Sequence, residues 1–452
     1  MQFIFFDDAA LYNGKVVDLR EKMAGVEKGM EYCPEFETII SIPRFAKPHD
    51  VSHIAKVETW ESFLAYGAER SDPPFERIAF HEPFLLYYSS GTTGTPKAIV
   101  HSVGGCTLNA LKEGRLHECA TPDTVALQYT TTGWIMYLAT ISSLLFGARA
   151  VLYDGSPFQP DLKTYIRIMG EQKITKLGTS PRWMFEVAKN NISPREVTDL
   201  SSLRVVTSTG MVLSDQLFEW FYDKGFPSNV QLANISGGTD IAGCFGIENP
   251  LEPVYVGGAQ GPSLGVAIAI YDSSLPDGPG QAVSDGTAGE LVAPLPFPNI
   301  PCFLWGDSSP SDAPGPRYRS SYFSRFDKVW VQGDFCQIHP LTGNIAFLGR
   351  ADGVLNPSGV RFGSAEIYAV IEKNFADKVV DSLCIGRRRK RDADENVMLF
   401  LLMKPGVPFD AELRKQVKNR IAKELTKRHV PKFVFETPEI PVGGHSCSST
   451  NP

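Results

Sequence analysis

Short runs of β-branched and aromatic residues alternate with helical stretches through the middle of the chain. Strand-like runs such as VALQY and LRVVTST enclose stretches that predict helices near 134–146, 160–172 and 181–190. Strand–helix alternation at this spacing is typical of βαβ units, in which a largely parallel sheet is covered by helices. The sequence therefore predicts an α/β fold.

The composition and the predicted secondary structure change twice after this region. From about Tyr255 the strands become shorter and glycine and proline crowd residues 276–316. The runs GELVAPL, VWVQGDFCQI and GNIAFLG predict a β-rich subdomain there. Beyond LGRAD, a helix beginning at Ser364, two strands and a basic helix predict a separate α+β domain of ordinary size. Ser214 and Ser364 are the expected N-caps of their helices. The predicted parts are a large domain at 1–350, a small domain at 351–442 and a loose tail at 443–452.

Charge and cysteine content exclude several classes of protein. The formal net charge is −7, so the whole molecule has no positive field that would gather nucleic acid or an anionic membrane. The eight cysteines form no CxxC pair, which argues against zinc clusters and favours reduced thiols in the cytoplasm. No secretion signal is expected at the N-terminus.

Two segments invite other interpretations. Residues 124–148 carry no charge, and a membrane-spanning helix is the alternative to the buried strand and helix that we expect there. The basic run at 387–391 would suit a localisation signal or a nucleic-acid patch. Acidic residues follow at once, however, and we expect a solvated hairpin loop.

The most informative segment is SSGTTGTPK at residues 89–97, between the strand-like runs FLLYY and KAIV. Its glycines let backbone amides turn toward an anion, its hydroxyls donate hydrogen bonds, and Lys97 adds a positive charge. A Walker loop is excluded because Pro96 precedes the lysine and a strand follows it. The sequence therefore predicts a phosphate-binding loop, with these candidate residues: Ser90, Thr92, Thr93, Gly94 and Lys97.

This loop resembles the phosphate loop of the adenylate-forming superfamily of acyl-CoA synthetases, luciferases and peptide-synthetase adenylation domains. Three further segments match that superfamily in order: SGGTD at 236–240, GDF around Asp334, and GRADGVLNPSGVRFGSAEI at 349–367. The resemblance implies a large α/β domain with a β-rich subdomain and a smaller α+β lid domain. It also implies ATP, Mg²⁺ and coenzyme A as reactants and cofactors.

The resemblance assigns roles to the matching residues. Thr239 would contact the phosphate of an adenylate, and Asp240 would hold Mg²⁺, although the family has the longer glutamate there. Asp334 would accept hydrogen bonds from ribose hydroxyls. Arg350 would reach the ribose and phosphates. The expected catalytic residues are Lys97, Thr239, Asp240 and Arg361, the last near the α-phosphate.

Further roles follow from the same resemblance. Asp352 would be the pivot about which the small domain turns, and Ser358 and Gly359 would line the coenzyme A tunnel. Gly210 and Met211 would lie beside the adenine, in a motif that reads Gly210-Met211-Val212 where acetate-specific relatives have Gly-Glu-Pro.

Three long stretches carry a narrower match: TTTGWIMYLATISSLLFGARAVLYDGSP, LRVVTSTGMVLSDQLFEWFY and YFSRFDKVWVQGDFCQIHP. Within the superfamily, they resemble the branch of acetoacetate–CoA ligases. Acetate-specific relatives carry a tryptophan at the place of Gly237, so Gly237 and Gly238 would enlarge the acyl pocket for a longer acid. Trp134 is a candidate wall of that pocket, with a plain apolar helix start as the alternative.

Two departures from this branch bear on activity. Its members have additional N-terminal residues, so the front half of the large domain is expected to be absent, and the lysine of their terminal Ser-Gly-Lys motif has no match here.

The predicted reaction is formation of acetoacetyl-CoA, AMP and pyrophosphate from acetoacetate, ATP and CoA. The alternatives are a ligase for another small or medium acid and a non-catalytic nucleotide-binding remnant. We expect no membrane span and no nucleic-acid partner.

Overall fold

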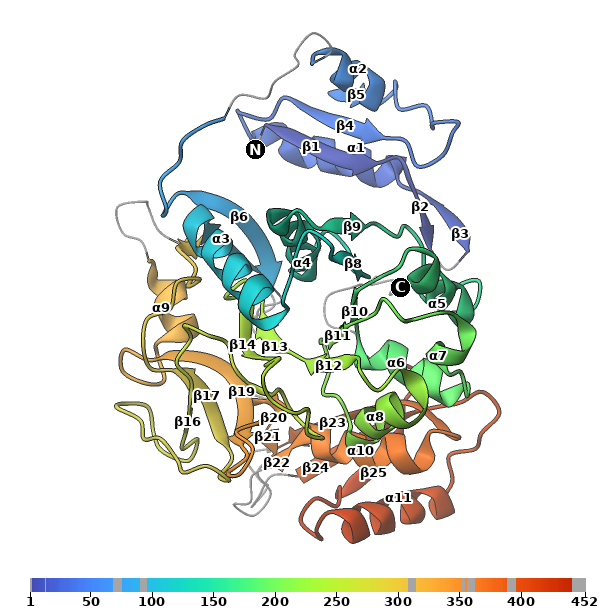
Figure 1. Ribbon diagram of the computed structural model, residues 1–452, viewed down its shortest axis with the longest axis vertical. Coiled ribbons are helices and arrows are strands. Elements are labelled where there is room, and N and C mark those ends of the chain that lie inside the picture. The colour runs from blue at the N-terminus through green and yellow to red at the C-terminus, as the bar shows by residue number, and fades with distance from the viewer. Residues whose placement is uncertain are drawn as a thin grey trace, which may run out of the picture. The chain divides into compact units, whose positions relative to one another are not determined.

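The computed structural model (Figure 1) describes most of the chain in two compact units. One unit comprises Met1–Ile78 and Tyr153–Ile168, and the other comprises Ala79–Leu152 and Met169–Pro452. The described residues are 2–12, 14–67, 75–89, 96–307, 314–351, 354–355, 362–387 and 396–440.

The first unit is built on a small parallel sheet in the order β1-β4-β5. Buried side chains of Met23, Phe36 and Ile39 form the centre of its core. Its elements are β1 (Phe3–Asp7), β2 (Ala9–Tyr12), β3 (Lys15–Asp18), α1 (Arg20–Gly29), η1 (Met30–Tyr32), β4 (Thr38–Ile42), β5 (Val57–Thr59) and α2 (Trp60–Ala65).

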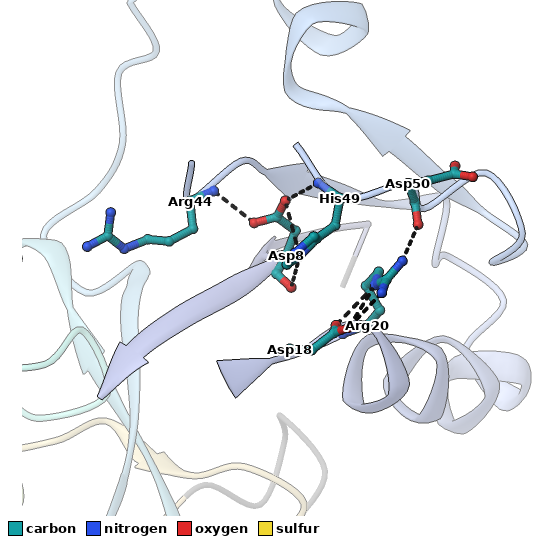
Figure 2. A network of polar contacts seen from close by, with 6 residues as sticks. All are labelled: Asp8, Asp18, Arg20, Arg44, His49 and Asp50. Atoms are coloured by element: carbon teal, nitrogen blue, oxygen red, sulfur yellow. Dashed lines mark hydrogen bonds and ion pairs between the residues drawn. The ribbon is translucent and has the colours of Figure 1, made fainter. Parts of the chain in front are cut away.

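Polar contacts tie the loops of this unit together (Figure 2). The buried carboxylate of Asp8 accepts hydrogen bonds from the backbone amides of Arg44 and His49, both at 2.8 Å. The Arg20 guanidinium binds Asp18 through two nitrogens and holds the pKa of that carboxyl below its usual range. Arg20 also donates to the carbonyl oxygen of Asp50. None of the predicted site residues belongs to this network.

The second unit contains the sheet that the alternating pattern predicts. Its strand order is β12-β11-β10-β8-β9, and every neighbouring pair is parallel. All four residues of β11 are buried, as expected for a strand covered on both faces. The strands are β8 (Val125–Gln128), β9 (Arg149–Val151), β10 (Lys176–Thr179), β11 (Val205–Ser208) and β12 (Gln231–Asn234).

The helices follow the predicted positions closely. The uncharged run at 124–148 is divided between β8, helix α4 and a 3₁₀ turn, and none of the described helices is long and apolar enough to cross a membrane. These elements are α3 (Val103–Lys112), η2 (Glu113–His117), α4 (Met136–Ser142), η3 (Ser143–Phe146), α5 (Leu162–Glu171), α6 (Pro181–Lys189), α7 (Pro194–Val197), α8 (Asp215–Trp220) and η4 (Phe221–Gly225).

Of the two predicted serine caps, Ser214 is the N-cap residue of its helix and Ser364 is not. Ser214 has the extended N-cap conformation before α8, but its hydroxyl accepts no capping hydrogen bond. Ser364 is the first residue of its helix, and Gly363 is the N-cap, whose backbone amide donates to the Glu366 side chain at 3.1 Å. A Cβ at position 363 would overlap the carbonyl oxygen of Leu348, so the close approach of the two segments requires glycine there.

Antiparallel strands form the β-rich part, as predicted. Phe245, Leu291 and Trp330 lie in its core. The elements are β6 (Pro83–Ser89), β7 (Lys97–Ser102), β13 (Ser236–Gly238), β14 (Gly243–Ile247), β15 (Gly261–Pro262), β16 (Ala269–Tyr271), β17 (Gly289–Ala293), β18 (Phe303–Leu304), α9 (Pro316–Tyr322), β19 (Trp330–Ile338) and β20 (Ile345–Arg350).

The C-terminal residues have a core of their own, which includes Ile367, Leu399 and Val417. This core supports the proposal of a small domain at 351–442. Arg387 pairs with Asn396 across two antiparallel strands, while the rest of the basic run and the tail at 443–452 lie outside the described residues. The elements are β21 (Val354–Leu355), β22 (Phe362–Gly363), α10 (Ser364–Phe375), β23 (Val379–Arg387), β24 (Asn396–Met403), α11 (Ala411–Glu424) and β25 (Phe433–Glu436).

Candidate active site

The residue predicted to bind phosphate, Lys97, contacts the residue predicted to bind a metal ion, Asp240. Lys97 is the first residue of β7, and Asp240 follows β13, so 143 positions separate them in the sequence. Their Nζ and Oδ1 atoms are 2.7 Å apart, and each side chain is about one-fifth exposed. The fold therefore places a cation and a carboxylate together at a partly open position.

Tyr322, the last residue of α9, completes this cluster. Its hydroxyl donates a hydrogen bond to Asp240 Oδ1 at 2.5 Å and accepts one from Lys97 Nζ at 3.3 Å. Its ring stacks on Trp330 with centroids 3.9 Å apart. Burial and the neighbouring carboxylate raise the pKa of Tyr322, so the hydroxyl remains a neutral donor. No motif or spacing in the sequence identified this residue.

The turn that carries Thr239 and Asp240 is held by three side chains from other elements. His101 Nε2 lies 2.8 Å from the carbonyl oxygen of Thr239, and since a carbonyl only accepts, this nitrogen carries the proton. Burial lowers the pKa of His101, which favours the neutral ring. Asn299 and Asn109 donate to the next carbonyl oxygens, those of Ile241 and Ala242. The candidate metal residue is therefore fixed by its backbone.

The three predicted acyl-pocket residues line a single cavity of about 110 Å³: Trp134, Gly237 and Gly238. A Cβ at Gly237 would overlap the carbonyl oxygen of Gly243 on the paired strand, so the close pairing of the two strands requires glycine there. A Cβ at Gly238 would lie 3.2 Å from the side-chain nitrogen of Gln332. The structure thus brings the candidate acyl pocket next to the turn with Thr239 and Asp240.

Trp134 also approaches the predicted adenine residues. Gly210 has a φ of +95°, and a Cβ on it would lie 3.5 Å from the Trp134 ring. Met211 beside it is exposed. The candidate acyl and adenine residues are therefore neighbours, as a shared acyl-adenylate would require.

The two predicted ribose residues are cross-strand partners. Asp334 on β19 is opposite Arg350 on β20, and their side chains pair at 3.1 Å. Arg350 also donates to the carbonyl oxygen of Gln332 at 3.2 Å. Gly333, between Gln332 and Asp334 in the sequence, has a φ of +78°. A Cβ on this residue would lie only 2.8 Å from the Arg350 guanidinium. Glycine is needed for the arginine to fold back over the strand.

Other candidates lie outside the described residues: Ser90, Thr92, Thr93, Gly94, Asp352, Ser358, Gly359 and Arg361. Their roles stay predictions. Among the residues that the structure does describe, no group of three or more His, Cys, Asp and Glu side chains could hold a metal ion. Asp240 still fits Mg²⁺, because the hydrogen bonds that described residues make with it are both at Oδ1. A magnesium ion needs only one or two carboxylates when phosphates supply other ligands.

Comparison with known proteins gives consistent matches. The AMP-binding enzyme family matches residues 11–296. Acetoacetyl-CoA synthetase of Gallus gallus is 40% identical over 444 residues, which are 97% of this chain and 64% of that protein. Malonamoyl-CoA synthetase vrtB of Penicillium aethiopicum is 36% identical over 460 residues, 98% of this chain and 60% of that protein. The chain therefore spans slightly less than two thirds of the length of these relatives.

A solved structure extends the match to three dimensions. The acetoacetyl-CoA synthetase from Streptomyces lividans superposes with a TM-score of 0.85 at 34% identity, covering 97% of this chain and 63% of that one. The fold class predicted from the sequence is confirmed.

Proposed function

The chain belongs to the AMP-binding enzyme family, and from this premise we propose that it is an ATP-dependent acid–CoA ligase. Its proposed reaction converts acetoacetate, ATP and CoA to acetoacetyl-CoA, AMP and pyrophosphate. The observation that carries the proposal is the contact of Lys97 with Asp240 beside the acyl cavity. The names of the relatives support acetoacetate as the acid.

In the first proposed step, a carboxylate oxygen of the acid attacks the α-phosphorus of ATP. A new P–O bond forms, the bond to the bridging oxygen breaks, and pyrophosphate leaves. In this proposal Lys97 binds phosphate oxygens and Thr239, on the turn held by His101, stabilises the developing charge. Mg²⁺ held by Asp240 would neutralise phosphate charge.

In the second proposed step, the sulfur of CoA attacks the acyl carbon of the adenylate. A C–S bond forms, the C–O bond to the phosphate breaks, AMP leaves, and the thiol proton passes to solvent or a base. We propose that the small domain turns about Asp352 for this step. All seven described cysteines are free thiols, which supports the proposed cytoplasmic location.

Another short acid is the second candidate substrate. Malonamoyl-CoA synthetase, by its name, uses an acid with an amide where acetoacetate has a methyl ketone, and it is only slightly less similar than the acetoacetyl-CoA synthetases. The cavity lined by Gly237 and Gly238 supports either acid as a candidate.

Acid-dependent exchange of labelled pyrophosphate into ATP tests the first step by itself. We expect exchange with acetoacetate that is lost in Lys97→Ala. Stronger exchange with malonamate than with acetoacetate would favour malonamate, the second candidate, as the substrate. Tight AMP binding without exchange for any acid would favour a non-catalytic nucleotide-binding remnant.

A further inference from the structure

The acyl cavity and a second cavity share a wall. The second cavity also measures about 110 Å³ and is lined by Thr124, Thr175 and Arg204 among others. Glu118 and Lys176 line both cavities. These two side chains therefore separate the space beside Gly237 from the space behind it.

The two residues form a tight ion pair at this wall. Lys176 Nζ lies 2.5 Å from Glu118 Oε1, and the side chains are 11% and 18% exposed. Lys176 begins β10, and Glu118 is the C-cap that follows η2, so two regular elements position the pair. The wall is consequently a fixed feature of the fold.

The sheet defines the path from the active-site turn to this wall. Gly178 lies two residues beyond Lys176 on the same face of β10 and is paired with Gln128 on β8. A Cβ at Gly178 would overlap the amide of Gln128, so the Gln128 side chain lies across the glycine. Gln128 and Lys176 both line the acyl cavity, which therefore extends along the strand to the ion pair.

An ion pair is a poor end wall for a hydrocarbon chain. A long aliphatic tail would press its methyl end against two charges and remove their remaining contact with water without offering a hydrogen bond. A carbonyl oxygen on the acid is able to accept from the ammonium group, which has three N–H donors. The wall thus favours short acids with a polar end.

We propose that the Glu118–Lys176 ion pair is the polar end wall of the acyl pocket and restricts the acid substrate to short chains. This inference rests on the proposed function, because it takes the cavity beside Gly237 as the acid site. Removal of both side chains joins the two cavities into one longer channel.

The test compares the wild type with the double variant Glu118→Ala/Lys176→Ala. The matched control is Glu186→Ala/Lys189→Ala, which removes a glutamate and a lysine that lie 4.0 Å apart on α6 and away from both cavities. Calorimetry measures binding of straight-chain acids from butyrate to dodecanoate and does not depend on turnover. We expect the double variant to bind octanoate at least tenfold more tightly than the wild type, and the control to be unchanged.

A folded double variant with the chain-length preference of the wild type would overturn the proposal. If the double variant does not fold, Glu118→Gln/Lys176→Met keeps the wall's volume without its charges. We then expect the ratio of acetoacetate to butyrate binding to fall at least fivefold, and an unchanged ratio would overturn the proposal. Absence of acid-dependent pyrophosphate exchange in the wild type contradicts the proposed function instead, so the two failures are distinguishable.

Discussion

The hydroxyl of Tyr322 lies 2.5 Å from the carboxylate oxygen Oδ1 of Asp240, the same atom that pairs with Lys97. This contact joins α9 to the turn after β13 and leaves Oδ2 of Asp240 without a hydrogen bond to any described residue. Tyr322 therefore orients the carboxylate for the metal that we propose it binds, and we interpret Tyr322 as a positioning residue.

Removal of that hydroxyl tests this interpretation. In Tyr322→Phe the ring still stacks on Trp330, so we expect the free energy of unfolding to fall by only about 1 kcal/mol. Adenylation should fall roughly tenfold, with a raised KM for MgATP, because Asp240 and Lys97 lose a shared partner. The control is Tyr318→Phe, since Tyr318 donates only to the Pro301 carbonyl oxygen among the described residues. Equal effects in both variants would argue against a positioning role.

Asp240 provides a second test through its metal dependence. Asp240→Asn keeps the shape but weakens the ligand for a hard cation, so the Mg²⁺ concentration for half-maximal pyrophosphate exchange should rise by about tenfold or more. Asp240→Glu, which has the family's side chain, should retain more activity than the asparagine variant. The titration is done at saturating ATP. An unchanged magnesium requirement in Asp240→Asn would exclude Asp240 as a ligand.

Gly178, which lies against the Gln128 side chain of the acyl cavity, offers a test of that cavity. In Gly178→Ala the new methyl group would displace the Gln128 side chain from the strand into the cavity. We expect KM for the acid to rise about tenfold, with little change in KM for ATP, because the adenine and ribose candidates lie on other elements. The additional variant Gln128→Ala should restore acid binding. Equal increases of both KM values would indicate general distortion.

Buried Glu248 predicts a pH dependence of stability. Burial, followed by the charge of Glu118, raises the pKa of Glu248 to about 8 from an ordinary value of 4.5, and neither carboxylate oxygen has a hydrogen-bond partner among the described residues. Between pH 4.5 and 8 the folded state holds a proton that the unfolded state has released. The free energy of unfolding should therefore fall as pH rises through this window, by at most about 1.4 kcal/mol per pH unit, and level off above it.

Urea unfolding at pH 5.5 and pH 8 measures this effect. Glu248→Gln should be more stable relative to the wild type at pH 8 than at pH 5.5, because the amide has no proton to lose. The exposed Glu219→Gln is the control and should follow the wild type at both values. An identical pH dependence for all three proteins would show that Glu248 is ionised in the folded state.

The sequence predicted those parts of the fold and site that depend on local pattern. Strand–helix alternation anticipated the parallel sheet, and the motifs around Lys97, Asp240 and Asp334 identified residues that the fold does place beside charged partners. Tyr322 could not be found in this way, because it is 82 positions from Asp240 and only α9 packing on Trp330 brings it there. The Glu118–Lys176 wall likewise depends on tertiary structure.

The central claim is that the cluster of Lys97, Asp240 and Tyr322 supports acid–CoA ligation. The most direct measurement incubates the purified chain with ATP, Mg²⁺, acetoacetate and CoA and quantifies AMP and acetoacetyl-CoA together. We predict equal amounts of both products, dependent on acid and CoA, and a loss of at least a hundredfold in Lys97→Ala. A folded chain that releases neither product, or a Lys97→Ala variant that matches the wild type, would contradict the account.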